Sequence, residues 1–288
     1  MKRAMFAAAM GLLLSTAAWA APVVTQTFEF AGSTAASITP TRDAFRAAVG
    51  GGSVAGSDGS FGGARREINW DGVPGTFTDT AALPGDFFNV TSPRGVVFST
   101  PGTGFLVSAN AGSATAPLFG FPSDFQVFSA QKLFTAVNSN ITDVRFFVPG
   151  TTTAASTSAF GLIFVDVEVA GQTRMEFFDQ NDALIYSRDA LAAGNQGLSF
   201  LGATVTGASI SRVRITSGLN TIVSNGVLGN PNDDVVVMDD FLYAEPLLVA
   251  TPEPPGILLM SVGLLGILAA ARRRTEHHSI LSRSDRAF

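Results

Sequence analysis

The sequence predicts an all-β protein: an antiparallel two-sheet β-sandwich of the jelly-roll type with one short helix. Two observations support this fold class. About a dozen short runs rich in β-branched and aromatic residues are separated by turns rich in Gly, Pro and Asn, and only one stretch has a convincing helical pattern. A signal peptide is predicted before this domain and a transmembrane helix after it.

The first 20 residues have the pattern of a secretory signal peptide. Lys2 and Arg3 form a positive n-region, Ala4–Leu14 forms an apolar h-region, and small residues precede the expected cleavage site between Ala20 and Ala21. The alternative is an uncleaved anchor helix, which the short apolar run disfavours. We therefore expect the exported domain to span residues 21–250.

The one predicted helix covers Thr39–Val49. Thr39 is the expected capping residue, Pro40 suits a first helical turn, and the glycines after Val49 end the pattern.

The remaining elements are predicted strands. In the first half of the domain they are Val24–Phe30, Arg66–Trp70, Gly95–Thr100, Phe125–Phe128, Leu133–Val137 and Asp143–Val148. In the second half they are Ile163–Val169, Arg174–Phe178, Leu184–Ser187, Ile210–Thr216 and Val235–Tyr243. Alternation of apolar and polar residues, as in Ile210–Thr216, predicts one buried and one solvated face. The turn-rich stretch between Phe178 and Leu184 predicts a hairpin.

Composition excludes several function classes. Residues 21–250 contain 20 Asp and Glu but 11 Lys and Arg, so this span carries nine more negative than positive charges. Such a surface is not expected to bind nucleic acid. The chain has no Cys, and its two histidines, His277 and His278, both lie near the C-terminus. The domain therefore cannot use disulfides, a Ser-His-Asp or Cys-His arrangement, or histidine-based zinc.

A second apolar segment lies near the C-terminus. Residues 256–271 are uncharged and would span about 24 Å as a helix, slightly less than a bilayer core of about 30 Å. The basic residues Arg272, Arg273 and Arg274 follow and can extend toward the lipid headgroups. The segment has no polar face, which disfavours the alternative of a buried core helix. By the positive-inside rule, the tail at 275–288 begins in the cytoplasm and the domain lies outside.

Pro252, Glu253 and Pro254 precede this segment, in a proline-rich stretch that disfavours a helix. The order Pro-Glu-Pro, apolar helix and arginine cluster resembles the sorting signal of bacterial PEP-CTERM proteins. The resemblance implies that exosortase, a membrane enzyme, recognises Pro252–Pro254 and removes the helix. The protein would then pass transiently through the inner membrane of a Gram-negative bacterium to the cell surface or extracellular polysaccharide matrix. The family usually ends soon after the arginines, whereas this chain continues to Phe288.

Segments of the domain also resemble exported PEP-CTERM proteins of unassigned role. They are REINWDGVP, SPRGVVFSTPGTGF, FGLIFVDVEVAG, MEFFD and VVVMDDFLYAEP. This resemblance implies no biochemical activity.

Asp239 and Asp240 are the candidate metal ligands, because they form a carboxylate pair inside an apolar strand. Calcium takes six to eight oxygen ligands, and other oxygens would come from loop carbonyls and nearby carboxylates. The candidate carboxylates are Glu67, Asp71, Asp166 and Glu168. In a regular strand, Asp239 and Asp240 point to opposite faces and cannot hold one ion together. The alternative is that these are ordinary turn and solvent-face carboxylates, with no structural calcium.

The sequence favours a non-catalytic binding or structural protein, with extracellular polysaccharide as a candidate ligand. The alternative is a glycan-active hydrolase that uses paired carboxylates, but no spacing singles out a pair. The whole chain has 24 Phe but only two Trp and two Tyr, so the domain offers few aromatic platforms for sugars. Only Trp70, Tyr186 and Tyr243 remain after the signal peptide.

Overall fold

The computed structural model describes residues 21–79, 83–114, 116–223, 226–228, 234–249 and 264–268. The predicted signal peptide with its Ala20–Ala21 junction, the sorting motif Pro252–Pro254, the basic cluster Arg272–Arg274 and the tail lie wholly or partly outside these residues. Of the predicted membrane helix, only residues 264–268 are described, and they are helical. Within the described part of the chain, none of the helices is both long and apolar enough to span a bilayer.

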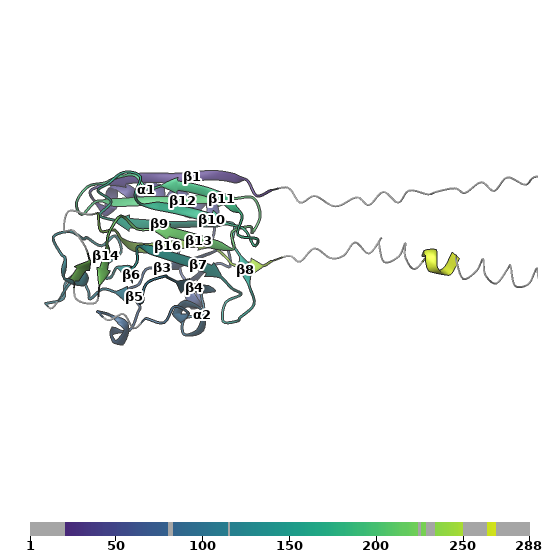
Figure 1. The fold of residues 1–288 in the computed structure, drawn as a ribbon, viewed down its shortest axis with the longest axis horizontal. Coiled ribbons are helices and arrows are strands. Elements are labelled where there is room, and N and C mark those ends of the chain that lie inside the picture. The colour runs from purple at the N-terminus through teal and green to yellow at the C-terminus, as the bar shows by residue number, and fades with distance from the viewer. Residues whose placement is uncertain are drawn as a thin grey trace, which may run out of the picture. The chain divides into compact units, whose positions relative to one another are not determined.

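The domain is built on two sheets whose strands are mostly antiparallel, so the predicted β-sandwich is confirmed (Figure 1). The first sheet contains β1 (Val24–Gly32), β2 (Ser60–Phe61), β3 (Arg65–Ile68), β5 (Gly104–Val107), β6 (Phe134–Val137), β9 (Ala159–Val165), β12 (Leu198–Val205), β14 (Thr221–Val223), β15 (Gly226–Leu228) and β16 (Val237–Ala244). Its path runs β1-β12-β9-β16-β6-β14-β15, with β3 also paired to β16, β2 to β3 and β5 to β6. The pair β6–β14 is parallel.

The second sheet has the order β11-β10-β13-β7-β4. Its strands are β4 (Val96–Ser99), β7 (Ile141–Phe146), β10 (Arg174–Phe178), β11 (Leu184–Asp189) and β13 (Arg212–Thr216). Strands β10 and β11 form the predicted hairpin. A separate two-stranded pair joins β8 (Ala155–Ser156) to β17 (Leu247–Leu248).

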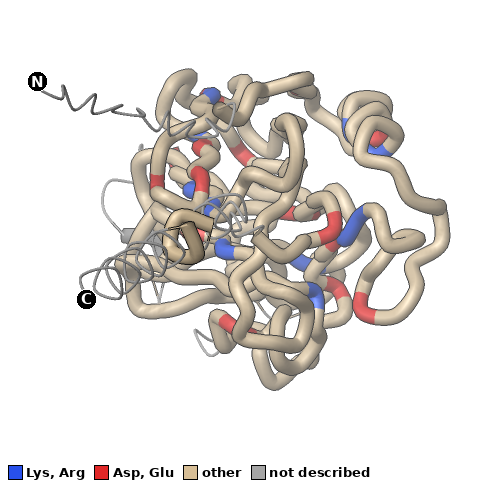
Figure 2. Tube along the Cα trace, turned by 90° about the vertical axis from the view of Figure 1, so that its right-hand side faces the viewer, with Lys and Arg blue, Asp and Glu red and all other residues tan. Residues whose placement is uncertain are grey.

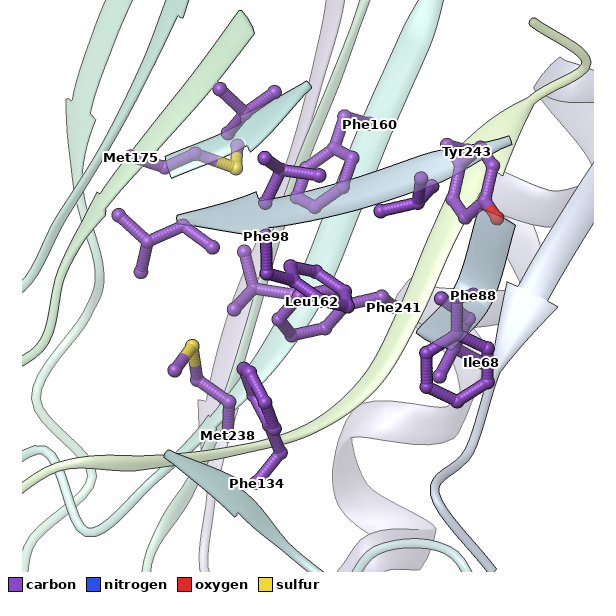
Figure 3. Packing of buried hydrophobic residues seen from close by; sticks show 14 of the residues in the cluster. Ile68, Phe88, Phe98, Phe134, Phe160, Leu162, Met175, Met238, Phe241 and Tyr243 are labelled. Carbon is purple, nitrogen blue, oxygen red and sulfur yellow. The ribbon is translucent and has the colours of Figure 1, made fainter. Parts of the chain in front are cut away.

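The main core fills the space between the two sheets. Alternate residues of β9 and β16 face alternate residues of β10 and β13, as the period of two in a strand requires. Phe98, Leu162 and Phe241 lie together in this layer, with Phe160 and Tyr243 beside them (Figure 3). The abundance of Phe is thus explained by core packing.

A second core covers the other face of the first sheet. Helix α1 (Ala35–Val49) packs there against β1 and β12. Its buried Phe45 lies over Gly161 and Gly202, which are directly paired across β9 and β12.

The other helical elements are short. Helix α2 (Phe87–Val90) lies next to β4, and 3-10 turns cover Ser57–Gly59, Gly75–Phe77 and Leu118–Gly120.

The predicted start of the helix was wrong. Helix α1 begins at Ala35, and Thr34 caps it by accepting a hydrogen bond from the backbone N–H of Ser37. Pro40 lies inside the helix, where it removes one backbone donor. The Thr39 hydroxyl donates to the Ala35 carbonyl oxygen at 2.8 Å within this first part of the helix.

Two strand predictions also needed correction. Residues 125–128 form no strand, although their side chains pack onto the second core. Strand β9 begins at Ala159, earlier than predicted, and ends at Val165 because Asp166 has a left-handed backbone, with φ of 72°. The strands that were not predicted are β2, β5, β8, β12, β14, β15 and β17. Both faces of β12 are largely buried, so its sequence lacks the alternation that indicates a half-exposed strand.

Candidate binding cavity under helix α1

A β-bulge in β16 places Asp239 and Asp240 on the same face of the first sheet. Met238 pairs with Phe164 and Phe241 pairs with Leu162, so β16 advances three residues where β9 advances two. Met238 and Phe241 both point into the core between the sheets. The two aspartates both turn toward α1 and the segment at 128–129, so the prediction of opposite faces was wrong.

Asp239 has a structural role beneath the segment at 128–129. Its carboxylate accepts hydrogen bonds from Phe128 N at 2.6 Å, Ser129 N at 3.3 Å and Ser129 Oγ at 2.9 Å. Burial, followed by the nearby charge of Asp240, raises the pKa of Asp239 well above its usual range. Because its side chain is enclosed and its oxygens are engaged, Asp239 is not available to a ligand.

Asp240 differs from Asp239 because one of its oxygens is unused. Its side chain is buried, and within the described part of the chain Oδ1 has no hydrogen-bond partner. Burial raises the pKa of Asp240. An unpartnered buried polar atom costs about 1–3 kcal/mol, so its presence calls for an explanation.

Asp240 lines a cavity of about 460 Å³ between α1 and the first sheet. This volume lies in the range of small-molecule sites. Helix α1 contributes Arg42 and Arg46, and the other polar lining residues are Thr39, Glu67, Asn69, Arg94 and Ser129.

Ion pairs hold one wall of the cavity. Arg46 Nε donates to Glu67 Oε1 at 2.8 Å, and Arg65 Nε donates to the same oxygen at 2.6 Å. Arg42 pairs with Asp43 at 2.7 Å. The charges of Glu67, Arg46 and Arg42 are therefore compensated within the protein. Charged residues of opposite sign also lie near one another elsewhere on the domain (Figure 2).

Arg94 is the exception among the lining arginines. Its Nε atom is buried without a hydrogen-bond partner among the described residues, and the nearby charge of Asp58 favours its charged form. Its guanidinium lies over the Phe88 ring at 5.2 Å from the centroid. Burial lowers the pKa of Arg94, because the charged form is taken partly out of water.

Of the other candidate calcium ligands, only Glu67 lines the cavity together with Asp240. The carboxylate of Asp71 accepts from Gln131 N and Lys132 N, both at 3.0 Å, and Asp166 accepts from Gln196 N at 2.8 Å. Glu168 is exposed at the end of β9. No group of three acidic or histidine side chains suited to a metal ion occurs among the residues described. With arginines beside Asp240, the residues present do not fit a calcium ion.

Asp166 gives the fold a pH dependence. Burial raises its pKa to about 7, and the charges of Glu168 and Asp234 add to the effect. Between pH of about 4 and about 7, the native state thus keeps a proton on Asp166 that the unfolded chain has released. The free energy of unfolding therefore falls as the pH rises through this range. We expect Asp166→Asn to raise the melting temperature by about 5 °C at pH 8 and not at pH 4, as measured by circular dichroism. An equal change at both pH values would contradict this assignment.

A larger open cavity, of about 770 Å³, is lined by Thr78, Asp79, Asn110, Gln131 and Lys132 among others. Its charged groups already have partners. Asp79 Oδ1 accepts from Ala109 N at 2.7 Å, and Lys132 Nζ donates to the Val73 carbonyl oxygen at 2.6 Å. This cavity therefore offers less to a ligand than the one under α1.

Sequence reasoning found Asp239 and Asp240 but missed the arginines of the cavity. Arg42, Arg46 and Arg94 come from segments up to 52 positions apart, and no local pattern links them. The aromatic residues considered for sugar stacking are in the core: Trp70, Tyr186 and Tyr243 are all buried.

Comparisons with known proteins identify no family. The chain matches no family model and no curated protein. Among solved structures it is similar to the K2 cleaved adhesin domain of Lys-gingipain, at 8% identity and a TM-score of 0.35, over 62% of this chain and 97% of that one. It is also similar to the Podospora anserina GH26-CBM35 β-(1,4)-mannanase, at 12% identity and 0.23, over 56% of this chain and 29% of that one.

A third similar structure is the enzymatically active domain of bacteriophage CBA120 tailspike protein 4, at 10% identity and a TM-score of 0.24. The match covers 58% of this chain and 21% of that one. With TM-scores this low, none of these likenesses supports a statement about function.

Proposed function

We propose that this protein is an exported, non-catalytic module of the cell surface or extracellular matrix that binds carbohydrate in the cavity under α1. One observation carries the proposal: the cavity is lined by two residues with buried, unpartnered polar atoms of complementary kind, Asp240 Oδ1 and Arg94 Nε.

Sugars suit this combination of groups. A hydroxyl group can donate to Asp240 and accept from Arg94, and adjacent hydroxyls on one ring can do both at once. Asn69, Ser129 and Thr39 add further donors and acceptors to the lining.

The cellular location in this proposal comes from the two ends of the sequence. The signal peptide directs export, and the Pro252–Pro254 motif with the following apolar segment and arginines matches an exosortase signal. A polysaccharide matrix is then the material that the exported domain meets.

A glycan array with the purified protein tests the function. We expect retention of a defined set of polysaccharides without release of reducing sugar. Absence of binding to every glycan would contradict the proposal. Release of sugar would instead support the hydrolase, for which Glu67 and Asp240 are the carboxylates that reach the cavity.

Replacing Pro252, Glu253 and Pro254 by alanine tests the sorting. In a host that carries exosortase, we expect the variant to keep its C-terminal segment, because the recognition element is lost. Mass spectrometry of the mature protein measures this directly. Identical mature masses for the variant and the parent would refute sorting through this motif.

A further inference from the structure

We propose that the cavity under α1 is specific for an acidic sugar residue, whose anionic group pairs with Arg94 while a neighbouring hydroxyl meets Asp240. This inference rests on the proposed carbohydrate function and names the class of sugar.

The charge balance of the cavity favours an anion. Arg42, Arg46 and Arg94 line it together with the carboxyl groups of Glu67 and Asp240. Glu67 is already shared between Arg46 and Arg65, at 2.5 Å and 2.6 Å. Two arginines thus share one carboxylate, and Arg94 Nε has no hydrogen-bond partner among the described residues, although the charge of Asp58 acts on Arg94. A carboxylate or sulfate on the ligand would add negative charge on this wall and accept charge-assisted hydrogen bonds.

Asp240 supplies an acceptor for a hydroxyl group of the same sugar. Burial raises the pKa of Asp240, whereas hydrogen bonds with Ser129 and Asp239 and the charge of Arg42 lower it. A carboxyl group accepts a hydrogen bond from a hydroxyl group in either protonation state. Asp240 can therefore bind a hydroxyl of the sugar while the acidic group on the same ring pairs with Arg94.

Arg94 is held in place before any ligand binds. Its guanidinium stacks on Phe88 and lies against Gly59, where an added Cβ would come within 2.6 Å of Arg94 Nε. Such packing reduces the side-chain entropy lost on binding. A fixed guanidinium also recognises a planar carboxylate by its fork of donors.

The aromatic residues of the cavity are poorly placed for stacking against a neutral sugar. Phe61 has the Arg65 guanidinium over its ring at 4.6 Å, and Phe128 has that of Arg42 at 4.8 Å. Since Trp70, Tyr186 and Tyr243 are in the core, recognition has to rely on charge and hydrogen bonds.

Isothermal titration with three tetrasaccharides of one backbone tests the proposal: oligogalacturonate, a sulfated oligogalactose and neutral oligogalactose. We expect the carboxylate or the sulfate form to bind at least about tenfold more tightly than the neutral form, corresponding to about 1.4 kcal/mol. Comparing the affinities of the two acidic probes shows whether the cavity prefers a carboxylate or a sulfate. This comparison uses the unmodified protein, so it does not depend on the folding of a variant.

Three variants locate the effect. Arg94→Gln should abolish the preference for the acidic probe, and Arg94→Lys should keep only part of it, because lysine retains the charge but not the fork of donors. Asp240→Asn should keep the preference, because it leaves the charge of Arg94 in place. Arg188→Gln, which alters an exposed ion pair with Glu29, is the control for a general loss of charge. Equal affinity for acidic and neutral probes, or an Arg94→Gln variant that folds and keeps the preference, would overturn the inference while leaving carbohydrate binding intact. Failure to bind any glycan would overturn both.

Discussion

Replacing Gly202 by valine should detach helix α1 from the first sheet and destroy the cavity. A Cβ at this position would lie 3.0 Å from Cδ2 and 3.1 Å from Cε2 of Phe45, and 3.2 Å from the Gly161 Cα. Phe45 cannot move away easily, because it packs edge-on against Phe28 at 5.5 Å and near Phe200 at 5.6 Å. Overpacking of this kind costs about 1–3 kcal/mol, and the two further methyl groups of valine place the cost at the upper end.

We expect the melting temperature of Gly202→Val to fall by about 6–12 °C for a domain of this size. Glycan binding should be lost at temperatures where the sheets remain folded, because Arg42 and Arg46 are carried by α1. Circular dichroism melting and titration calorimetry measure the two effects. Gly112→Val is the matched control, because a Cβ there meets no atom within 4 Å. Wild-type stability and binding in Gly202→Val would show that α1 does not depend on this contact.

Replacing Trp70 by alanine should have the largest effect on stability. Trp70 is 1% exposed and stacks on Phe134 with parallel rings 3.9 Å apart. It also meets Phe88 and Phe241 edge-on. Removing a buried Trp costs about 3–5 kcal/mol. The loss extends to the bulge, because the indole Nε1 donates to the Asp239 carbonyl oxygen at 2.9 Å.

Urea unfolding followed by far-ultraviolet circular dichroism measures the loss. Trp70→Phe separates the two contributions: it keeps a stacking ring but leaves the Asp239 carbonyl oxygen without its donor, at a cost of about 1–3 kcal/mol. Phe30→Ala is the control for loss of an aromatic ring, because Phe30 is 46% exposed and should cost about 0.5 kcal/mol or less. Similar midpoints for Trp70→Ala and Phe30→Ala would mean that Trp70 is not a central part of the core.

The sequence alone was sufficient where the structural signal is local. In β13, Val213 and Ile215 face the core as their alternation with Arg212 and Arg214 predicts, because successive side chains in a strand point to opposite faces. The β10–β11 hairpin was predictable for the same reason, since its turn residues lie between two short strands. The export and sorting signals are also local patterns, and they remain predictions from the sequence.

The tertiary structure decided the cavity. Whether Asp239 and Asp240 share a face depends on the register of β16 against β9, a strand about 75 positions earlier. A bulge in that pairing cannot be recognised from the alternation of apolar and polar residues in the sequence. The start of α1 at Ala35 is set by a local cap, because Thr34 accepts a hydrogen bond from Ser37 N, and the prediction missed it because Pro40 was read as the mark of the first turn. Arg94 looks like any surface arginine in the sequence. Its Nε atom lacks a partner only because folding buries it beside residues that are already paired, and burial is a property of the whole fold rather than of any segment.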